Sequence, residues 1–185
     1  MPVKVITPPA QAISTAELRL QSRADTDSAS ENVLFVGWIA AAVNLAQHQT
    51  GRSIGAQTLE LALDCFPSVR IPLPQGPVTG ITSIKYIDVA GVEQTLSPTL
   101  YTLNDYGLVC NAVPKLGTAW PTVDGSVNCV KIRYTAGDLD PAVKTALHLM
   151  VAHWYAQRAA SSALNLNEIP MGAQALLDTV KVWAV

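Results

Sequence analysis

The spacing of apolar and polar positions changes twice along the chain. Between about residues 15 and 50, apolar residues recur every three or four positions, which is the spacing of helices. Residues 54–136 instead show short alternating runs, the spacing of β-strands, and from residue 137 the helical spacing returns. The pattern predicts an α+β fold. Helices from residues 1–53 and 137–185 form one core, and residues 54–136 form a small inserted antiparallel β subdomain.

Prolines, caps and glycines set the expected limits of the N-terminal helices. Three prolines make residues 1–13 an extended arm, because proline fixes φ and lacks the backbone donor that a helix needs. Ser14 caps a short helix over about residues 15–23. A longer helix follows, and it ends at Thr50 because Gly51 is suited to the left-handed backbone that often follows a helix.

Helical spacing returns in the C-terminal part. Asp140 is an N-cap and Pro141 suits the first helical position, which predicts a helix from there to about Ala160. This helix is apolar nearly all round, so we expect it to be buried. A polar break follows, and Pro170 opens a last helix that extends to the C-terminus.

Short alternating runs characterise residues 54–136. The first, "QTLELALD", places Leu59, Leu61 and Leu63 on one face. Turns containing Gly, Pro, Asp or Asn separate it from the later runs, and together they predict about five to seven short strands. We expect a small antiparallel sheet or barrel with its prolines in edges and connections.

Composition favours a protein whose surface is covered in an assembly. Charged residues make up 14% of the chain, against about 25% in an average soluble protein. The net charge is −2 and the cations are scattered along the sequence, which argues against tight nucleic-acid binding. We expect no secretory signal, no contact with a membrane, and no disulfide framework from the three cysteines.

The run "KTALHLMVAHWYAQR" carries the strongest hint of chemistry. His148 and His153 point about 140° apart on a helix, whereas metal-binding pairs on one helix use i,i+3 or i,i+4 spacing. No glutamate stands between them to form an H-E-x-x-H motif. We therefore expect structural histidines, no metal, no cofactor and no enzymatic activity. The alternative is a site in which one of them meets a distant acid: Asp64, Asp105 or Asp138.

One face of the long N-terminal helix carries only small or short side chains. At helical spacing this face consists of Gly37, Ala40, Ala41 and Asn44. Such a face lets another backbone approach closely, so we expect a subunit interface there. Larger apolar residues are expected on the opposite side: Leu34, Trp38, Ile39, Val43 and Leu45.

The last helix has an apolar stripe and a polar opposite face. The stripe consists of Ala173, Leu176, Leu177, Val180 and Trp183. An amphipathic helix behind a polar hinge can dock in a partner's groove. The alternative is that it packs back on its own subunit.

Ordered segments of the chain resemble tailed-phage head–tail connector (adaptor, or head completion) proteins. They cover roughly residues 30–182, and the ordered set carries the resemblance: "TGRSIGAQTLELALDCFP", "IPLPQGPVTGITSIKYIDVAGVEQTL", "WP", "VKIRYTAG", "PAVKTALHLMVAHWYAQR" and "IPMGAQALLDTVKV".

The resemblance implies a structural virion protein, made in the host cytoplasm and located at the head–tail junction. Such proteins form a homo-oligomeric ring, commonly of twelve copies, between the portal protein and a stopper or tail-side neck protein. The ring continues the DNA channel without binding a particular DNA sequence. The resemblance also implies that the last helix docks on the portal.

A different binding role is the main alternative. A DNA-packaging accessory would contact nucleic acid directly, and a basic stripe on one face of the folded protein would favour it.

Overall fold

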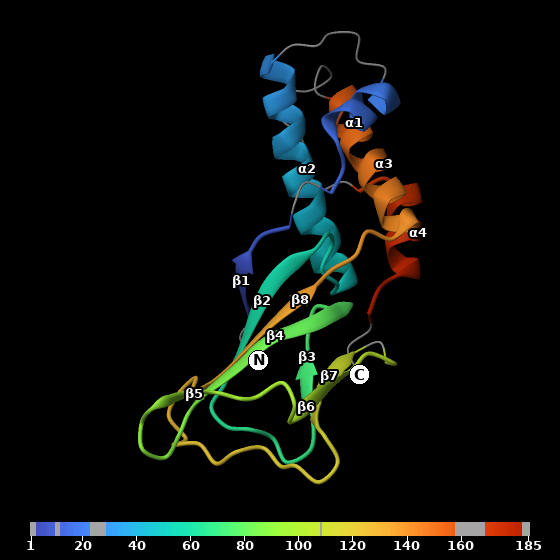
Figure 1. Cartoon of the computed structure of the whole chain (residues 1–185). Helices are drawn as coiled ribbons and strands as arrows, with labels where there is room; N and C mark the ends of the chain where they lie inside the picture. Colours follow the sequence, from blue (N-terminus) through green and yellow to red (C-terminus); the bar gives the residue numbers. More distant parts are fainter. Residues whose placement is uncertain (1–2, 10–11, 23–28, 108, 158–168, 183–185) are drawn as a thin grey trace. The chain divides into compact units, whose positions relative to one another are not determined.

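The structure is a computed structural model that describes residues 3–9, 12–22, 29–107, 109–157 and 169–182. Its internal contacts divide the chain into two compact units. The β unit comprises Met1–Pro9 and Ala56–Asp138, and the helical unit comprises Ala10–Gly55 and Leu139–Val185. The described residues contain four helices and two antiparallel sheets, so the fold is mixed α+β (Figure 1).

The β unit is built from a five-stranded sheet and a three-stranded sheet. The larger sheet has the strand order β1-β2-β8-β4-β5, and the smaller has the order β3-β7-β6. The strands are β1 (Val3–Thr7), β2 (Gln57–Leu63), β3 (Ile71–Leu73), β4 (Val78–Ile87), β5 (Glu93–Thr95), β6 (Tyr101–Asn104), β7 (Cys110–Pro114) and β8 (Val130–Ala136).

Strand β8, at the centre of the larger sheet, shows why these sequences form strands. Its residues alternate between buried positions such as Ile132 and exposed positions such as Lys131. Ile132 lies opposite Leu61 of β2 and Ile84 of β4, and in-register partners point to the same face. One face of the larger sheet is therefore apolar, and both sheets supply residues to a single core.

Tyr134 and Trp120 fix the connections of the β unit. The Tyr134 hydroxyl donates to the Pro74 carbonyl at 2.9 Å, and burial raises the pKa of that hydroxyl. Between β7 and β8 the chain has no regular secondary structure, and the Trp120 ring stacks on Phe66 with 5.2 Å between centroids. Aromatic stacking thus anchors a long connection to the unit.

The helical unit contains α1 (Thr15–Ser22), α2 (Ala29–Thr50), α3 (Pro141–Gln157) and α4 (Met171–Thr179). The predicted caps are confirmed. Ser14 and Glu17 form a reciprocal capping box, in which the Glu17 amide donates to the Ser14 hydroxyl at 3.1 Å and the Ser14 amide donates to the Glu17 carboxylate at 3.2 Å. Asp140 accepts the Ala142 amide at 2.8 Å and caps α3.

Gly51 ends α2 as the sequence predicts. Its φ is +68°, in the left-handed region that favours glycine, and its amide donates to the Gln47 carbonyl at 2.9 Å. The core of the helical unit draws on all four helices, and it includes Leu18, Phe35, Ile39, Leu147, Met150, Trp154 and Leu177.

Two segments differ from expectation. The N-terminal arm, which the sequence groups with the helices, contributes strand β1 to the larger sheet by pairing with β2, with Lys4 opposite Glu60. The last helix ends at Thr179, short of the C-terminus, where the Val180 amide bonds the Leu177 carbonyl. The Val182 amide then donates to the Thr50 carbonyl at the end of α2, so an interaction with another helix replaces a further turn.

Candidate functional site

The small-residue face of α2 is open to solvent over most of its length. Gly37, Ala40 and Asn44 are exposed, and Ala41 is half-buried against the core of the helical unit. Apart from its chain neighbours and the backbone of its own helix, a Cβ atom built on Gly37 would have no atom within 4 Å. No described part of the chain fills the space beside Gly37.

Large apolar side chains extend this face. Val33 is 72% exposed and Val36 is 49% exposed, and both share the face with Gly37 and Ala40 by helical spacing. On the opposite side of α2, where larger apolar residues are predicted, four are buried or half-buried: Ile39, Val43, Trp38 and Leu45. The fifth, Leu34, is 49% exposed. The outward side of α2 is thus more apolar than the four predicted residues indicate.

An aromatic cluster orients α2 on α3. Phe35 stacks on Tyr155 with 5.2 Å between centroids, and Trp38 meets both rings edge-on, at 5.8 and 6.3 Å. Such contacts add to the burial of the rings themselves. The cluster holds one side of α2 on the unit's own core, and the Gly37–Ala40 side remains outward.

The apolar stripe of α4 lies largely in the core of its own unit. Ala173 and Leu177 are buried, and Leu176 and Val180 are half-buried against the same core. Trp183, the last residue of the predicted stripe, lies outside the described residues. This is the packing of the alternative stated above, in which the helix packs on its own subunit.

The histidines of α3 are half-buried, and no described polar group bonds their Nε2 atoms. This holds for both His148 and His153. Burial chiefly lowers the pKa of His148, opposed by the charge of Glu17 and reinforced by that of Lys144. Among the described residues, no group of three or more His, Cys, Asp or Glu side chains could hold a metal ion.

The acids of the alternative catalytic site belong to the β unit. The two histidines are in the helical unit, whereas the acids that would have to orient them are in the β unit: Asp64, Asp105 and Asp138. The third histidine, His48, is exposed in the last turn of α2. No described helix is long and apolar enough to cross a membrane.

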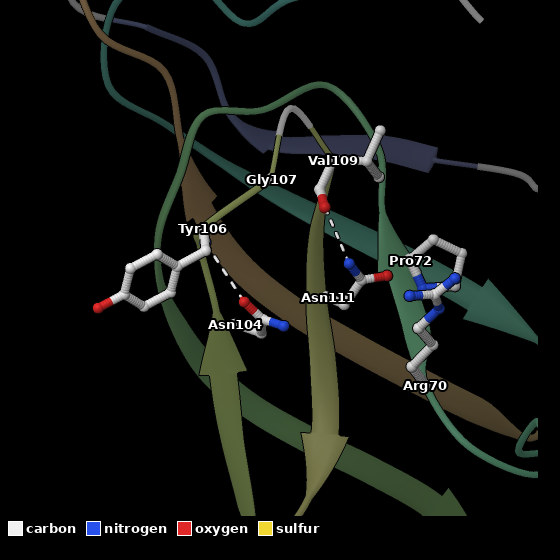
Figure 2. A pocket seen from close by; sticks show the side chains of 7 residues that line it. All are labelled: Arg70, Pro72, Asn104, Tyr106, Gly107, Val109 and Asn111. Carbon is white, nitrogen blue, oxygen red and sulfur yellow. Dashed lines mark hydrogen bonds between the residues drawn. The ribbon is translucent and has the colours of Figure 1, made fainter. Parts of the chain in front are cut away.

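A shallow pocket of about 550 Å³ lies on the three-stranded sheet beside the turn between β6 and β7 (Figure 2). The Asn111 side chain donates to the Val109 carbonyl at 2.8 Å, and the Tyr106 amide donates to the Asn104 side chain at 3.3 Å. Both amide side chains thus fix the turn. The lining residues are Arg70, Pro72, Asn104, Tyr106, Gly107, Val109 and Asn111.

The pocket has the chemistry of a contact surface. Its described lining contains no carboxylate, histidine or cysteine that could act as acid, base or nucleophile. Tyr106 is 99% exposed and Arg70 is also exposed, and these two residue types are enriched in protein interfaces. The sequence indicates only a turn at Tyr106–Gly107, because the pocket forms when Arg70, distant in sequence, lies beside that turn.

Comparison with known proteins adds the fold but no family. No protein-family model and no curated protein matches the chain. A chain of a structure described as the virion of the native gene transfer agent (GTA) particle is 24% identical, with a TM-score of 0.78. A chain from the neck of the empty GTA particle computed with C6 symmetry is 24% identical, with a TM-score of 0.80. A chain from the neck of the native GTA particle computed with C12 symmetry is 23% identical, with a TM-score of 0.77. Each comparison covers 100% of this chain and 97% of the other, so the likeness in fold extends over the whole chain.

Proposed function

We propose that the chain is a structural protein of the neck of a phage-like particle. Copies of it form a ring that joins the portal to a stopper or tail-side neck protein and continues the DNA channel. One observation carries the proposal: the fold is shared, over the full length, with chains from the virion and neck of a GTA particle. The role is structural rather than catalytic, in keeping with the chemistry of the pocket.

The exposed face of α2 is the proposed contact between copies. A ring repeats one interface around its axis, so each subunit needs a surface that its own fold leaves open. Val33, Val36, Gly37 and Ala40 supply such a surface. The necks computed with C6 and C12 symmetry support an assembly of repeated copies.

A substitution on this face tests the ring. Ala40→Trp adds bulk at an exposed position, so the fold should remain while close packing between copies is lost. Sedimentation of the protein alone and with purified portal rings should show wild-type assemblies and a monomeric variant. Ala41→Trp is less useful because Ala41 also contacts the unit's own core.

The matched control is Ala156→Trp, at an exposed position of α3. It introduces the same side chain into the same unit and should assemble normally. If Ala40→Trp assembles as well as Ala156→Trp does, the α2 face is not the interface. If wild-type protein remains monomeric beside portal rings and fails to bind them, the neck proposal itself is wrong.

The C-terminal end is the proposed contact with the portal. Because Ala173 and Leu177 are buried in the helical unit, removing all of residues 170–185 would damage the fold as well as any docking. Removing only residues 183–185 leaves these two side chains in place, together with the packing of Val180 and the hydrogen bond of Val182 to Thr50. We expect this shorter variant to fold, by circular dichroism, and to lose portal binding. Unchanged binding would show that the end of the chain does not dock.

A further inference from the structure

The outward face of the five-stranded sheet gathers cations that are far apart in the sequence. Lys131 and Arg133 are exposed on β8, at positions that alternate with the buried core residues. Lys4 on β1 and Lys85 on β4 occupy the corresponding outward positions of their strands and are also exposed. We call this surface the basic sheet face, and its charged residues are Lys4, Lys85, Lys131, Arg133, Glu60 and Glu93.

The charge of this face opposes that of the rest of the chain. Four cations and two carboxylates give it a net charge of +2. The whole chain has 12 Lys and Arg and 14 Asp and Glu, so eight cations and twelve carboxylates remain elsewhere, a net charge of −4. The cations that are scattered in the sequence are therefore segregated by the fold.

Internal ion pairs use only part of this positive charge. Arg133 is 2.7 Å from Glu60, and Lys85 is 2.8 Å from Glu93. Lys131 lies directly opposite Lys85 in the β4–β8 register, and like charges at such a position are unfavourable in a sheet. The hydrogen bond and charge of Lys85 chiefly lower the pKa of Glu93, and the charge of Lys131 adds to this effect. Two lysines thus share one carboxylate, and an anion over the face would be held by both.

The other side chains of the face favour a phosphate backbone over a protein partner. Thr58 and Thr135 are in-register partners, and the Thr79 hydroxyl is 2.9 Å from that of Thr135. Within the described strands of the larger sheet, the exposed large apolar residue is Val5, which lies opposite the buried Leu59 and belongs to the core side. Ile87, paired with Glu93, is half-buried at the β5 side of the face. Protein interfaces have an apolar or aromatic centre, whereas phosphate contacts use Lys, Arg and hydroxyl side chains.

We propose that the basic sheet face binds the phosphate backbone of duplex DNA without reading its sequence. Lys4 and Arg133 are two strands apart, or about 10 Å, and Arg133 and Lys131 are two residues apart, or about 7 Å. Cations at these separations can contact neighbouring phosphates of one duplex. This goes beyond the proposed neck role, in which a channel needs no DNA-binding residues, and it does not depend on ring formation.

Salt-dependent DNA binding by the full-length protein tests this inference. Fluorescence anisotropy with a short labelled duplex of arbitrary sequence should show binding at about 50 mM salt, with a log–log salt slope of about −3 for three or four phosphate contacts. Lys85→Gln combined with Lys131→Gln should weaken binding about tenfold or more and reduce the slope by about two. The variant removes the unfavourable Lys85–Lys131 pair together with the exposed Lys85–Glu93 ion pair, so these effects offset and its Tm should stay close to that of wild type.

The matched control is Arg70→Gln combined with Lys115→Gln. It removes the same charge from exposed positions of the same unit that lie outside the face, and its affinity should stay within about twofold of wild type. Absence of binding at about 50 mM salt, or an equal loss in both variants, overturns the inference. Competition by a polyglutamate peptide at an affinity equal to that of DNA would assign the face to acidic polypeptides and also overturn it.

Discussion

The outward sides of α2 and β8 show how differently the two units treat their surfaces. On α2 the outward residues include Val33 and Val36, beside Gly37 and Ala40. On β8 they are Lys131 and Arg133. Each unit buries its own apolar core, so neither surface is explained by folding alone. The apolar side chains on the α2 surface suit contact with another protein. The charged side chains on the β8 surface suit contact with water, ions or a polyanion.

The largest expected losses of stability come from substitutions in the two cores, because each unit should depend on its own core. Trp154→Ala in the helical unit should lower the free energy of unfolding by about 3–5 kcal/mol, and Ile132→Ala in the β unit by about 2–5 kcal/mol. Both side chains are at most 2% exposed. Urea unfolding followed by circular dichroism measures both changes.

The control for the core variants is Leu116→Ala in the β unit. Leu116 is fully exposed, so its truncation should stay within about 0.5 kcal/mol of wild type. A loss as large as that of Ile132→Ala would mean that the β unit depends on residues outside the core described above.

Loss of the N-cap of α3 should reduce stability by a smaller amount. Strands have no counterpart to such a cap. Asp140→Ala removes the acceptor of the Ala142 amide and should cost about 1 kcal/mol in free energy of unfolding. Asp140→Asn keeps an acceptor and should cost much less. Equal losses in the two variants, measured by urea unfolding, would show that the cap bond does not stabilise the helix.

The smallest effect compares one carboxylate from each unit as pH falls. A hydrogen bond from Lys144 chiefly lowers the pKa of Glu17 below its ordinary value of 4.5, whereas the Val92 amide chiefly lowers that of Asp88 below 3.8. In both cases the folded pKa is the lower one, so the stability contribution is complete above the ordinary value. It is lost as pH falls through the folded pKa.

Salt should separate these two carboxylates. Thermal unfolding between pH 6 and pH 3 should depend less on pH in Glu17→Gln and in Asp88→Asn than in wild type. About 1 M NaCl screens the exposed Lys144 pair and should shrink the Glu17 difference. The Asp88 difference should persist, because backbone amides are its main partners. Equal salt sensitivity would contradict this contrast between the units.

Sequence predicts those features whose causes are local. The ends of α1, α2 and α3 follow from Ser14, Gly51 and Asp140, because each cap bonds residues within a turn of itself. The pairing of Val3 with Leu61 has no local signal, so the N-terminal strand is read only as an extended arm. The stripe of α4 is visible in the sequence, but its periodicity is the same whether it packs inward or on a partner.

The candidate surfaces follow the same rule. The small-residue face of α2 is predictable because a helix brings together residues three and four apart. The basic sheet face cannot be predicted in this way. Lys4, Lys85 and Lys131 share a face only because the strands are ordered β1-β2-β8-β4. A sequence without known pairing shows the alternation of Lys131 and Arg133 but not what lies beside them.

The strand order also bears on how the chain emerges during synthesis. Strands β2 and β4 do not pair with one another, and each pairs with β8. Both precede β8 in the sequence, so both are made before the strand that joins them. Because the chain is made from its N-terminus onward, β2 and β4 lack the strand that pairs with both until Val130–Ala136 has been made. Until then, the edges that β8 will cover are open to neighbouring chains. A lysine in an edge strand discourages such association. Lys85 lies on β4, which has such an open edge, whereas Lys4 lies on β1, an edge strand of the finished sheet. The two lysines should therefore discourage association at different stages.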